Sequence, residues 1–324
     1  MNAMWPELPF DAWQETCSAL HLYSQVVGKY RLARTPWINH SWHATFYVNA
    51  RGLTTSLIPD ATGIEIIFDL VRHAVIGNAA DGRRAEIPLG PMSVAEFHAR
   101  FRELIGRLGG TPEFDGRPNE VPDQTPFREN RRPRPYDAEA VRRFFQALAS
   151  IDRVLYRFRT GFIGKVSPVH LFWGSFDLAV TRFSGRPAPL HPGGIPALPN
   201  DVTREAYSHE VSSAGFWPGG GGADFAAFYS YAYPTPNGFA DGQVLPTGAY
   251  FDHKLGEYLL PYDVVRKSGE PEAALMAFLE STYRAAADTG RWDRAALECS
   301  IGYPLRPRAL QEMTEPTEDP SSRV

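Results

Sequence analysis

The stretch Pro36–Trp42, which reads PWINHSW, has a counterpart later in the chain in Pro168–Trp173, which reads PVHLFW. Each copy comes after a helical pattern and a Gly-Lys pair, Gly28-Lys29 in the first case and Gly164-Lys165 in the second. Strand patterns and then another helical pattern follow each copy. The sequence therefore predicts an internal duplication, with two halves that are each ordered as helix, strands and helix.

Capping residues mark the expected helices. Ser93 and Glu96 form a capping box, Asp137 can cap a second helix, and Pro271 stands at a first helical position. A glycine after the last apolar residue is typical of a helix end, and on that ground Gly28 ends the first helix. Four long helices are predicted, over residues 11–27, 94–108, 137–160 and 271–289.

Between these helices the apolar residues recur every second position, which is typical of strands. The pair Asp81-Gly82 is a hairpin signal. The strands are not separated by crossover helices, so the fold class is α+β with mostly antiparallel sheet and packed helices. Strands are predicted within residues 42–50, 64–70, 73–76, 85–89, 169–183, 225–233, 248–253 and 257–261.

Composition limits the class of protein. The chain has 324 residues, 43% of them hydrophobic, and a net charge of −4, which disfavours a general nucleic-acid surface. It has two cysteines, Cys17 and Cys299, and no apolar run long enough to span a membrane. We expect a cytoplasmic protein that contacts neither nucleic acid nor membrane.

The expected organisation is two tightly packed halves and a tail. The first α+β half covers residues 1–130 and the second covers 131–310, while residues 311–324 are polar and expected to be disordered. The connector at residues 111–136 is rich in proline and arginine, which indicates a solvated linker or a site for an anionic ligand. Two loops rich in glycine and proline, at residues 186–200 and 216–224, are expected to roof a pocket.

Histidines inside aromatic segments are the candidate catalytic residues. His40 and His170 occupy comparable places in the two halves, and His209 precedes the glycine-rich loop. These three imidazoles with Glu210 or Asp177 as carboxylate would suit zinc or iron and leave one coordination position open. The alternative for each histidine is a partly buried ring that is hydrogen-bonded to backbone or to a carboxylate.

Three arginines at predicted strand ends are the candidate cofactor-binding residues. The guanidinium groups of Arg51, Arg182 and Arg186 can hold a carboxylate or a phosphate, although salt bridges explain most such arginines. The aromatic residues of 225–233 place Phe225, Tyr229, Tyr231 and Tyr233 on one strand face. That pattern is typical of a core or of a pocket wall.

The chain resembles an uncharacterised bacterial family known only as a domain of unknown function, the 5996 family. The likeness covers roughly Trp5–Leu297 and rests on the segments 28–29, 35–40, 50–55, 167–170, 184–186 and 207–210. The resemblance implies one complete family domain. It brings no activity, ligand or catalytic residue.

Three classes of function fit these observations. The first is a metal-assisted enzyme that acts on a small molecule at the seam between the halves. The second is a binding protein for a small-molecule ligand, with an aromatic pocket and structural histidines. The third is a protein-interaction module. Unpaired polar side chains within aromatic segments are costly, which favours the first class.

Overall fold

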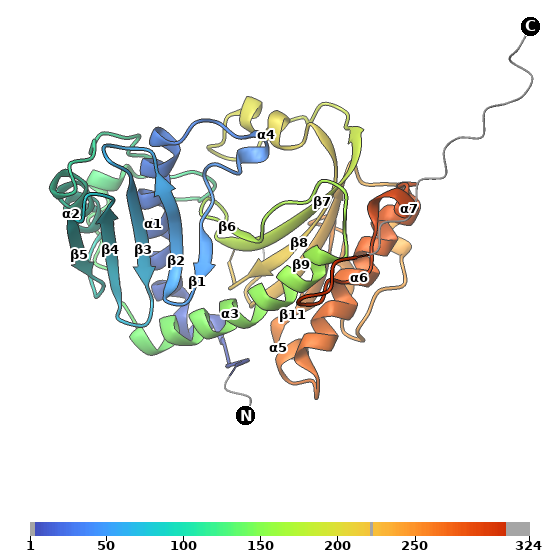
Figure 1. Cartoon of the computed structure of the whole chain (residues 1–324). Helices are drawn as coiled ribbons and strands as arrows, with labels where there is room; N and C mark the ends of the chain where they lie inside the picture. The colour runs from blue at the N-terminus through green and yellow to red at the C-terminus, as the bar shows by residue number, and fades with distance from the viewer. Residues whose placement is uncertain (1–3, 221–222, 309–324) are drawn as a thin grey trace, which may run out of the picture.

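The computed structural model describes residues 4–220 and 223–308, and it is an α+β fold with two antiparallel sheets (Figure 1). The predicted tail at 311–324 and two glycines of the predicted loop 216–224 lie outside these residues. The described part contains no helix that is both long and apolar enough to cross a membrane.

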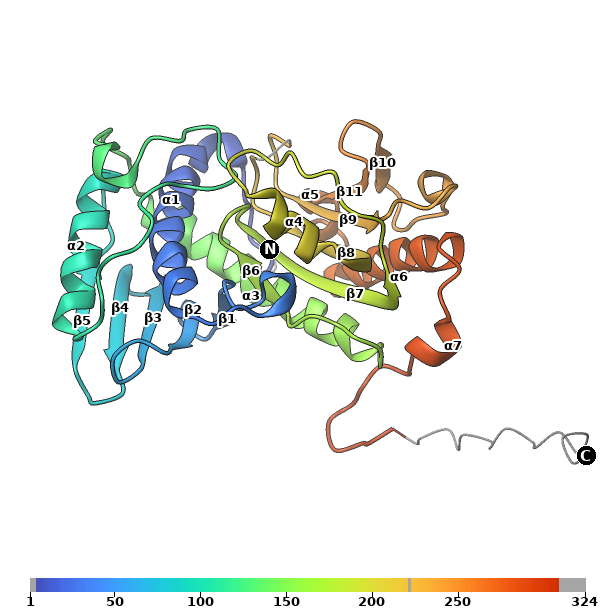
Figure 2. The same cartoon turned by 90° about the horizontal axis from the view of Figure 1, so that it is seen from above.

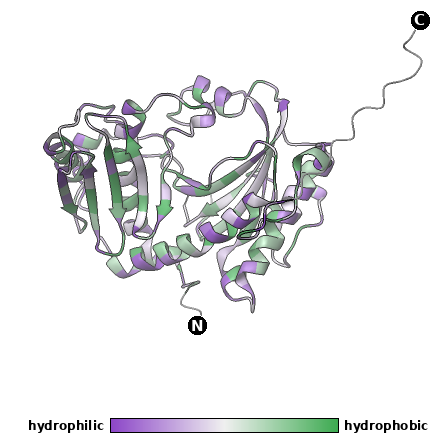
Figure 3. Cartoon of the chain, in the orientation of Figure 1, coloured by the Kyte–Doolittle hydropathy of each residue, from purple (hydrophilic) through white to green (hydrophobic). Residues whose placement is uncertain are grey.

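The first sheet is a meander in which each strand pairs with its neighbour in the chain. Figure 3 shows that its strands are mostly hydrophobic, and Figure 2 shows α1 and α2 beside it. The Ser93 hydroxyl accepts a hydrogen bond from the Glu96 amide, so the predicted capping box of α2 is confirmed. The elements are α1 Phe10–Arg34, β1 Tyr47–Asn49, β2 Gly52–Ile58, β3 Ile64–Asp69, β4 Ala74–Ala79, β5 Arg84–Pro88 and α2 Val94–Arg107.

The second sheet has six strands in the order β10-β11-β9-β8-β7-β6. Helices α3 and α6 pack against one of its faces, and the short helix α4 lies over the other (Figure 1). The elements are α3 Ala138–Thr160, β6 His170–Phe172, β7 Asp177–Pro187, α4 Asn200–Ala206, β8 His209–Trp217, β9 Ala227–Tyr233, β10 Tyr250–Asp252, β11 Glu257–Pro261, α5 Tyr262–Arg266, α6 Pro271–Thr289 and α7 Arg294–Leu297.

The two sheets meet at a single backbone pair. The Phe46 amide donates to the Leu171 carbonyl at 2.9 Å, and the Leu171 amide donates to the Phe46 carbonyl at 2.8 Å. Both side chains are fully buried in one hydrophobic cluster that includes residues of both predicted halves. Helix α3 runs below both sheets in Figure 1. The order helix, antiparallel sheet, helix occurs in each half, while common descent of the halves stays a prediction.

Two expectations about the first half are wrong. Gly28 does not end α1, which continues to Arg34, so it is not equivalent to Gly164 in its loop. A Cβ atom at Gly28 would lie 2.3 Å from Trp173 Cδ2, so this glycine serves a close approach and not a helix end. The predicted strand at 42–50 is shortened to β1 because a tight turn at 39–41, in which His40 has a φ of 59°, turns the chain first.

Two strands are missing from the sequence prediction, β2 at residues 52–58 and β8 at the centre of the second sheet. Residues 209–217 form β8, which pairs along its length with β7 and β9 at the centre of the second sheet. Strand β8 begins with polar residues and is followed by glycines, a composition that is typical of a loop. Pairing with two neighbouring strands outweighs that local composition.

Candidate functional site

The face of the second sheet that lies away from α3 and α6 carries a continuous set of polar and aromatic side chains. Strand register brings Thr181 opposite Ser213, and Ser213 opposite Tyr231. Successive strand residues point to opposite faces, so alternate positions share this face while the others enter the core. The sheet residues that line the resulting cleft are Phe172, Asp177, Ala179, Thr181, Phe183, Val211, Ser213, Trp217, Tyr229, Tyr231 and Glu257.

The cleft comprises three neighbouring chambers that share wall residues. The central chamber, over the sheet, has a volume of about 300 Å³. A chamber of about 760 Å³ reaches toward α1, and another of about 420 Å³ reaches toward Trp37. Glu120 contributes to the walls of all three. The site therefore draws on both predicted halves, and it has room for a ligand larger than the central chamber alone.

Asp177 is the buried centre of the cleft. Its two carboxylate oxygens accept hydrogen bonds from the hydroxyl groups of Ser175 and Tyr229. Burial raises the pKa of Asp177, and these two hydrogen bonds oppose part of that rise. The arrangement fixes the carboxyl group in place.

Glu257 and Glu120 bring two further carboxyl groups to the cleft. Burial and then the charge of Asp177 raise the pKa of Glu120 to about 7 and that of Glu257 to about 8. The Oε2 atom of Glu257 is buried without a hydrogen-bond partner. Like charges gathered in a site of low polarity explain these shifts.

The local backbone is adapted to hold Glu120. This residue has a φ of 58°, in the left-handed region, where a non-glycine residue is strained. A Cβ atom at Gly174 would lie 2.1 Å from Glu120 Oε1, so a larger residue there would displace that carboxyl group. Such strained positions are concentrated at binding and catalytic sites.

Aromatic rings form the rest of the cleft surface. The rings of Trp217 and Tyr229 stack at 4.5 Å, and Tyr231 stacks on Tyr229 at 6.1 Å. The hydroxyl groups of Tyr207 and Tyr231 are 2.9 Å apart and share a hydrogen bond. Burial raises the pKa of Tyr207 to about 12, so its hydroxyl group stays protonated at neutral pH.

The roof of the cleft includes α4 and both loops named from the sequence. Ile195 and Leu198 come from the loop at 186–200, and Gly219, from the loop at 216–224, lines the chamber toward α1. In the predicted roof, residues 221 and 222 lie outside the described part. The loop residues are apolar or small, so they close the cleft without adding charge.

His40 fastens this roof to the rest of the protein. Its backbone N–H donates to Glu205 Oε2 at 2.8 Å, and its Nδ1–H donates to the Ala206 carbonyl at 2.8 Å. Its Nε2 then accepts from Lys165 Nζ at 2.5 Å. Burial lowers the pKa of His40, and the Lys165 charge adds to that effect, so the ring is held neutral.

The three histidines do not form the expected ligand set. The rings of His40 and His209 are 6.0 Å apart, but His170 is fully buried among Trp42, Tyr47 and Phe172. Burial lowers the pKa of His170 to about 3, and neither ring nitrogen has a hydrogen-bond partner. Within residues 4–220 and 223–308 no three His, Cys, Asp or Glu side chains are placed to hold one metal ion.

Glu210, Arg186 and Arg51 form hydrogen bonds and ion pairs away from the cleft. Glu210 Oε2 accepts from Arg186 Nη2 at 2.7 Å and from the Ser184 hydroxyl at 2.8 Å. Arg186 also donates to the Gly290 carbonyl at the end of α6. The guanidinium of Arg51 pairs with Asp69 at 2.8 Å in the first sheet. None of these groups lines the cleft.

Arg182 lies on the opposite face of the sheet from the cleft. Its guanidinium stacks 3.5 Å from the ring centroid of Phe158 and donates to the Phe158 carbonyl at 2.6 Å.

Of the eight residues proposed from the sequence as catalytic or cofactor-binding, only His40 and Asp177 line the cleft.

The sequence hypotheses missed Glu120 and Glu257. The alternation of Tyr229 and Tyr231 was a sound signal for a pocket wall. Strand β11 pairs with β9, and this pairing places Glu257 beside Tyr231 on the same pocket wall. Glu120 lies in an irregular segment with no periodicity, so no local pattern points to it.

A model of a family of unknown function (DUF5996) matches residues 5–299. Comparison with curated proteins and with solved structures finds no match.

Proposed function

This chain belongs to the DUF5996 family of unknown function, which supplies no activity, and from the cleft itself we propose that the protein binds a small organic cation. The observation that carries the proposal is the convergence of Glu120, Asp177 and Glu257 on an aromatic cleft, whose central chamber is lined by no lysine or arginine of the described residues. The ligand class is an amine or a quaternary ammonium compound.

Electrostatics favours a positive ligand. Burial raises the pKa values of all three carboxyl groups, and the charge of Asp177 raises those of Glu120 and Glu257 further. A cation placed among them would stabilise their ionised forms and so lower those pKa values. Its binding would release protons at neutral pH, since Glu120 and Glu257 are partly protonated in the free protein.

The aromatic walls suit the same ligand. A cation over the face of Trp or Tyr within about 6 Å gains roughly 0.5 to 2 kcal/mol, with the larger value where water is excluded. Trp217, Tyr229 and Tyr231 supply such faces on one wall. Apolar groups of the ligand would contact Ile195 and Leu198 in the roof.

An acid–base enzyme is the second candidate function. The pKa values of Glu120 and Glu257, about 7 and about 8, lie close to neutral pH. A general acid or base works best when its pKa is near the working pH. This alternative replaces the predicted three-histidine site with carboxyl groups, while binding of zinc or iron stays a prediction.

Titration calorimetry with choline and with its uncharged isostere 3,3-dimethyl-1-butanol tests the proposal. Choline is expected to bind and the isostere not to bind. Since choline keeps its charge at every pH, its affinity should rise from pH 6 to pH 8 as the carboxyl groups ionise, with protons released. Asp177→Asn should weaken binding at least tenfold, about 1.4 kcal/mol.

Glu210→Gln is the matched control, because Glu210 is an acidic residue of the same sheet that lies outside the cleft. Its affinity for choline should equal that of the unmodified protein. Equal binding of choline and the isostere, or no binding of choline at pH 8, would contradict the proposal.

A further inference from the structure

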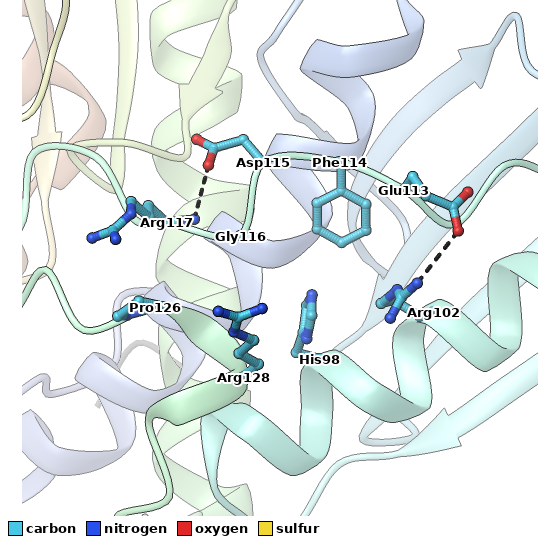
Figure 4. A pocket seen from close by; sticks show the side chains of 9 residues that line it. All are labelled: His98, Arg102, Glu113, Phe114, Asp115, Gly116, Arg117, Pro126 and Arg128. Atoms are coloured by element: carbon cyan, nitrogen blue, oxygen red, sulfur yellow. Dashed lines mark hydrogen bonds and ion pairs between the residues drawn. The ribbon is translucent and has the colours of Figure 1, made fainter.

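A separate cavity of about 310 Å³ lies between α2, the segment 113–117 and the short helical turn Phe127–Glu129. Figure 4 shows the His98 ring between the guanidinium groups of Arg102 and Arg128, with the Phe114 ring beside this row. Arg117 stands at the edge of the same cavity. Helix α2 and the turn at 127–129 thus direct basic groups to one hollow.

The two acidic residues of the cavity wall already have partners. Asp115 pairs with Lys29 Nζ at 2.6 Å, and the Lys29 side chain is buried outside this cavity. Glu113 Oε1 contacts Arg102 Nη2 at 3.4 Å, a long contact between exposed groups. Arg128 donates its Nε–H to Glu129 at 3.2 Å, which leaves its Nη donors for another acceptor.

The surroundings of His98 lower the pKa of its imidazole. Burial lowers its pKa, and the charges of Arg102 and Arg128 lower it further. Its ring packs against Phe114 at 5.5 Å and Phe127 at 5.9 Å between centroids, so the ring is held in place. The neutral ring carries one N–H, so this fixed imidazole adds one hydrogen-bond donor to those of the two guanidinium groups beside it.

We infer that this cavity binds an anionic group, the phosphate or carboxylate of a small metabolite, through Arg102, Arg128 and His98. Guanidinium groups offer paired N–H donors that match the oxygen atoms of such groups. Phe114 would contact an apolar part of the same ligand. The inference is independent of the cation proposed for the cleft, because it concerns a different cavity.

The segment 113–117 separates this cavity from the cleft. Asp115 and Arg117 line both this cavity and the chamber of the cleft near Trp37. An anion bound here would therefore lie next to the same backbone that leads to Glu120.

An NMR pH titration of His98 tests the inference, with the resonance assigned by its loss in His98→Gln. Inorganic phosphate is expected to raise the pKa of His98 by about one unit, because an anion nearby favours the imidazolium form. Citrate in a parallel titration separates a carboxylate from a phosphate preference. Sodium chloride at equal ionic strength is the reference, because salt alone screens Arg102 and Arg128.

Arg128→Gln should remove the effect of the anion, while its own titration without anion starts from a higher His98 pKa. Arg100→Gln is the control, since Arg100 lies on the same helix, pairs with Glu96 and does not line the cavity. It should retain the full response. If neither phosphate nor citrate shifts the His98 pKa beyond the chloride reference, or if Arg128→Gln responds as strongly, the inference is wrong.

Discussion

Glu257→Gln is expected to raise the free energy of unfolding by ~2 to 4 kcal/mol at pH 8, with no gain at pH 4. The pKa of Glu257 is raised from 4.5 to about 8 in the folded protein by burial and by Asp177. The folded state therefore holds this proton more strongly than the unfolded state. Stability falls as pH rises from about 4.5 to about 8, and the amide removes that loss.

Urea unfolding at several pH values measures this effect. Glu103→Gln is the control, because Glu103 is an exposed residue of α2. Its stability should follow the same pH profile as the unmodified protein. A gain for Glu257→Gln that is equal at pH 4 and pH 8 would show that its source is not ionisation. Glu257→Gln should also bind choline more weakly, because residues that serve binding often lower the stability of the protein.

Gly28→Ala is expected to destabilise the protein by roughly 2 to 3 kcal/mol, although alanine is the better helix former. The added methyl group would lie 2.3 Å from Trp173 Cδ2, in the middle of α1. Trp173 is buried, so its ring cannot move aside without disturbing the hydrophobic cluster. Thermal unfolding followed by circular dichroism measures the loss.

Gly106→Ala supplies the comparison with the opposite sign. Gly106 lies in α2, and a Cβ atom there would meet nothing within 4 Å. The substitution should stabilise the protein by ~0.5 to 1 kcal/mol through helix propensity alone. Destabilisation in both variants would mean that the contact with Trp173 is not the cause at Gly28.

Local signals in the sequence predicted much of the fold. Asp137 caps α3, Pro271 begins α6, and the Asp81-Gly82 pair lies in the turn between β4 and β5. These features depend on residues a few positions apart, so the sequence carries them directly. The close packing at Gly28 depends on Trp173, and the strand β8 depends on its two neighbouring strands, so these features have distant partners that leave no local pattern.

The site was less accessible to sequence reasoning than the fold. Asp177 and His40 were named, but for metal coordination, whereas the structure pairs Asp177 with Ser175 and Tyr229. Glu120 reaches the cleft through an irregular segment. Its position becomes evident only when the two sheets are assembled, because the sheet and the segment are far apart in the chain.

The backbone pair of Phe46 and Leu171 has a consequence for self-association. Strands β1 and β6 have three residues each, and without the other sheet each would end its own sheet with unpaired amide and carbonyl groups. Open strand edges recruit further strands and lead to aggregation. The Phe46–Leu171 pair joins these two inner edges at one position, and among the strands of the described residues β5 and β10 form the outer edges. The β5 edge carries exposed charges at Arg84 and Glu86, which discourage another chain from pairing there.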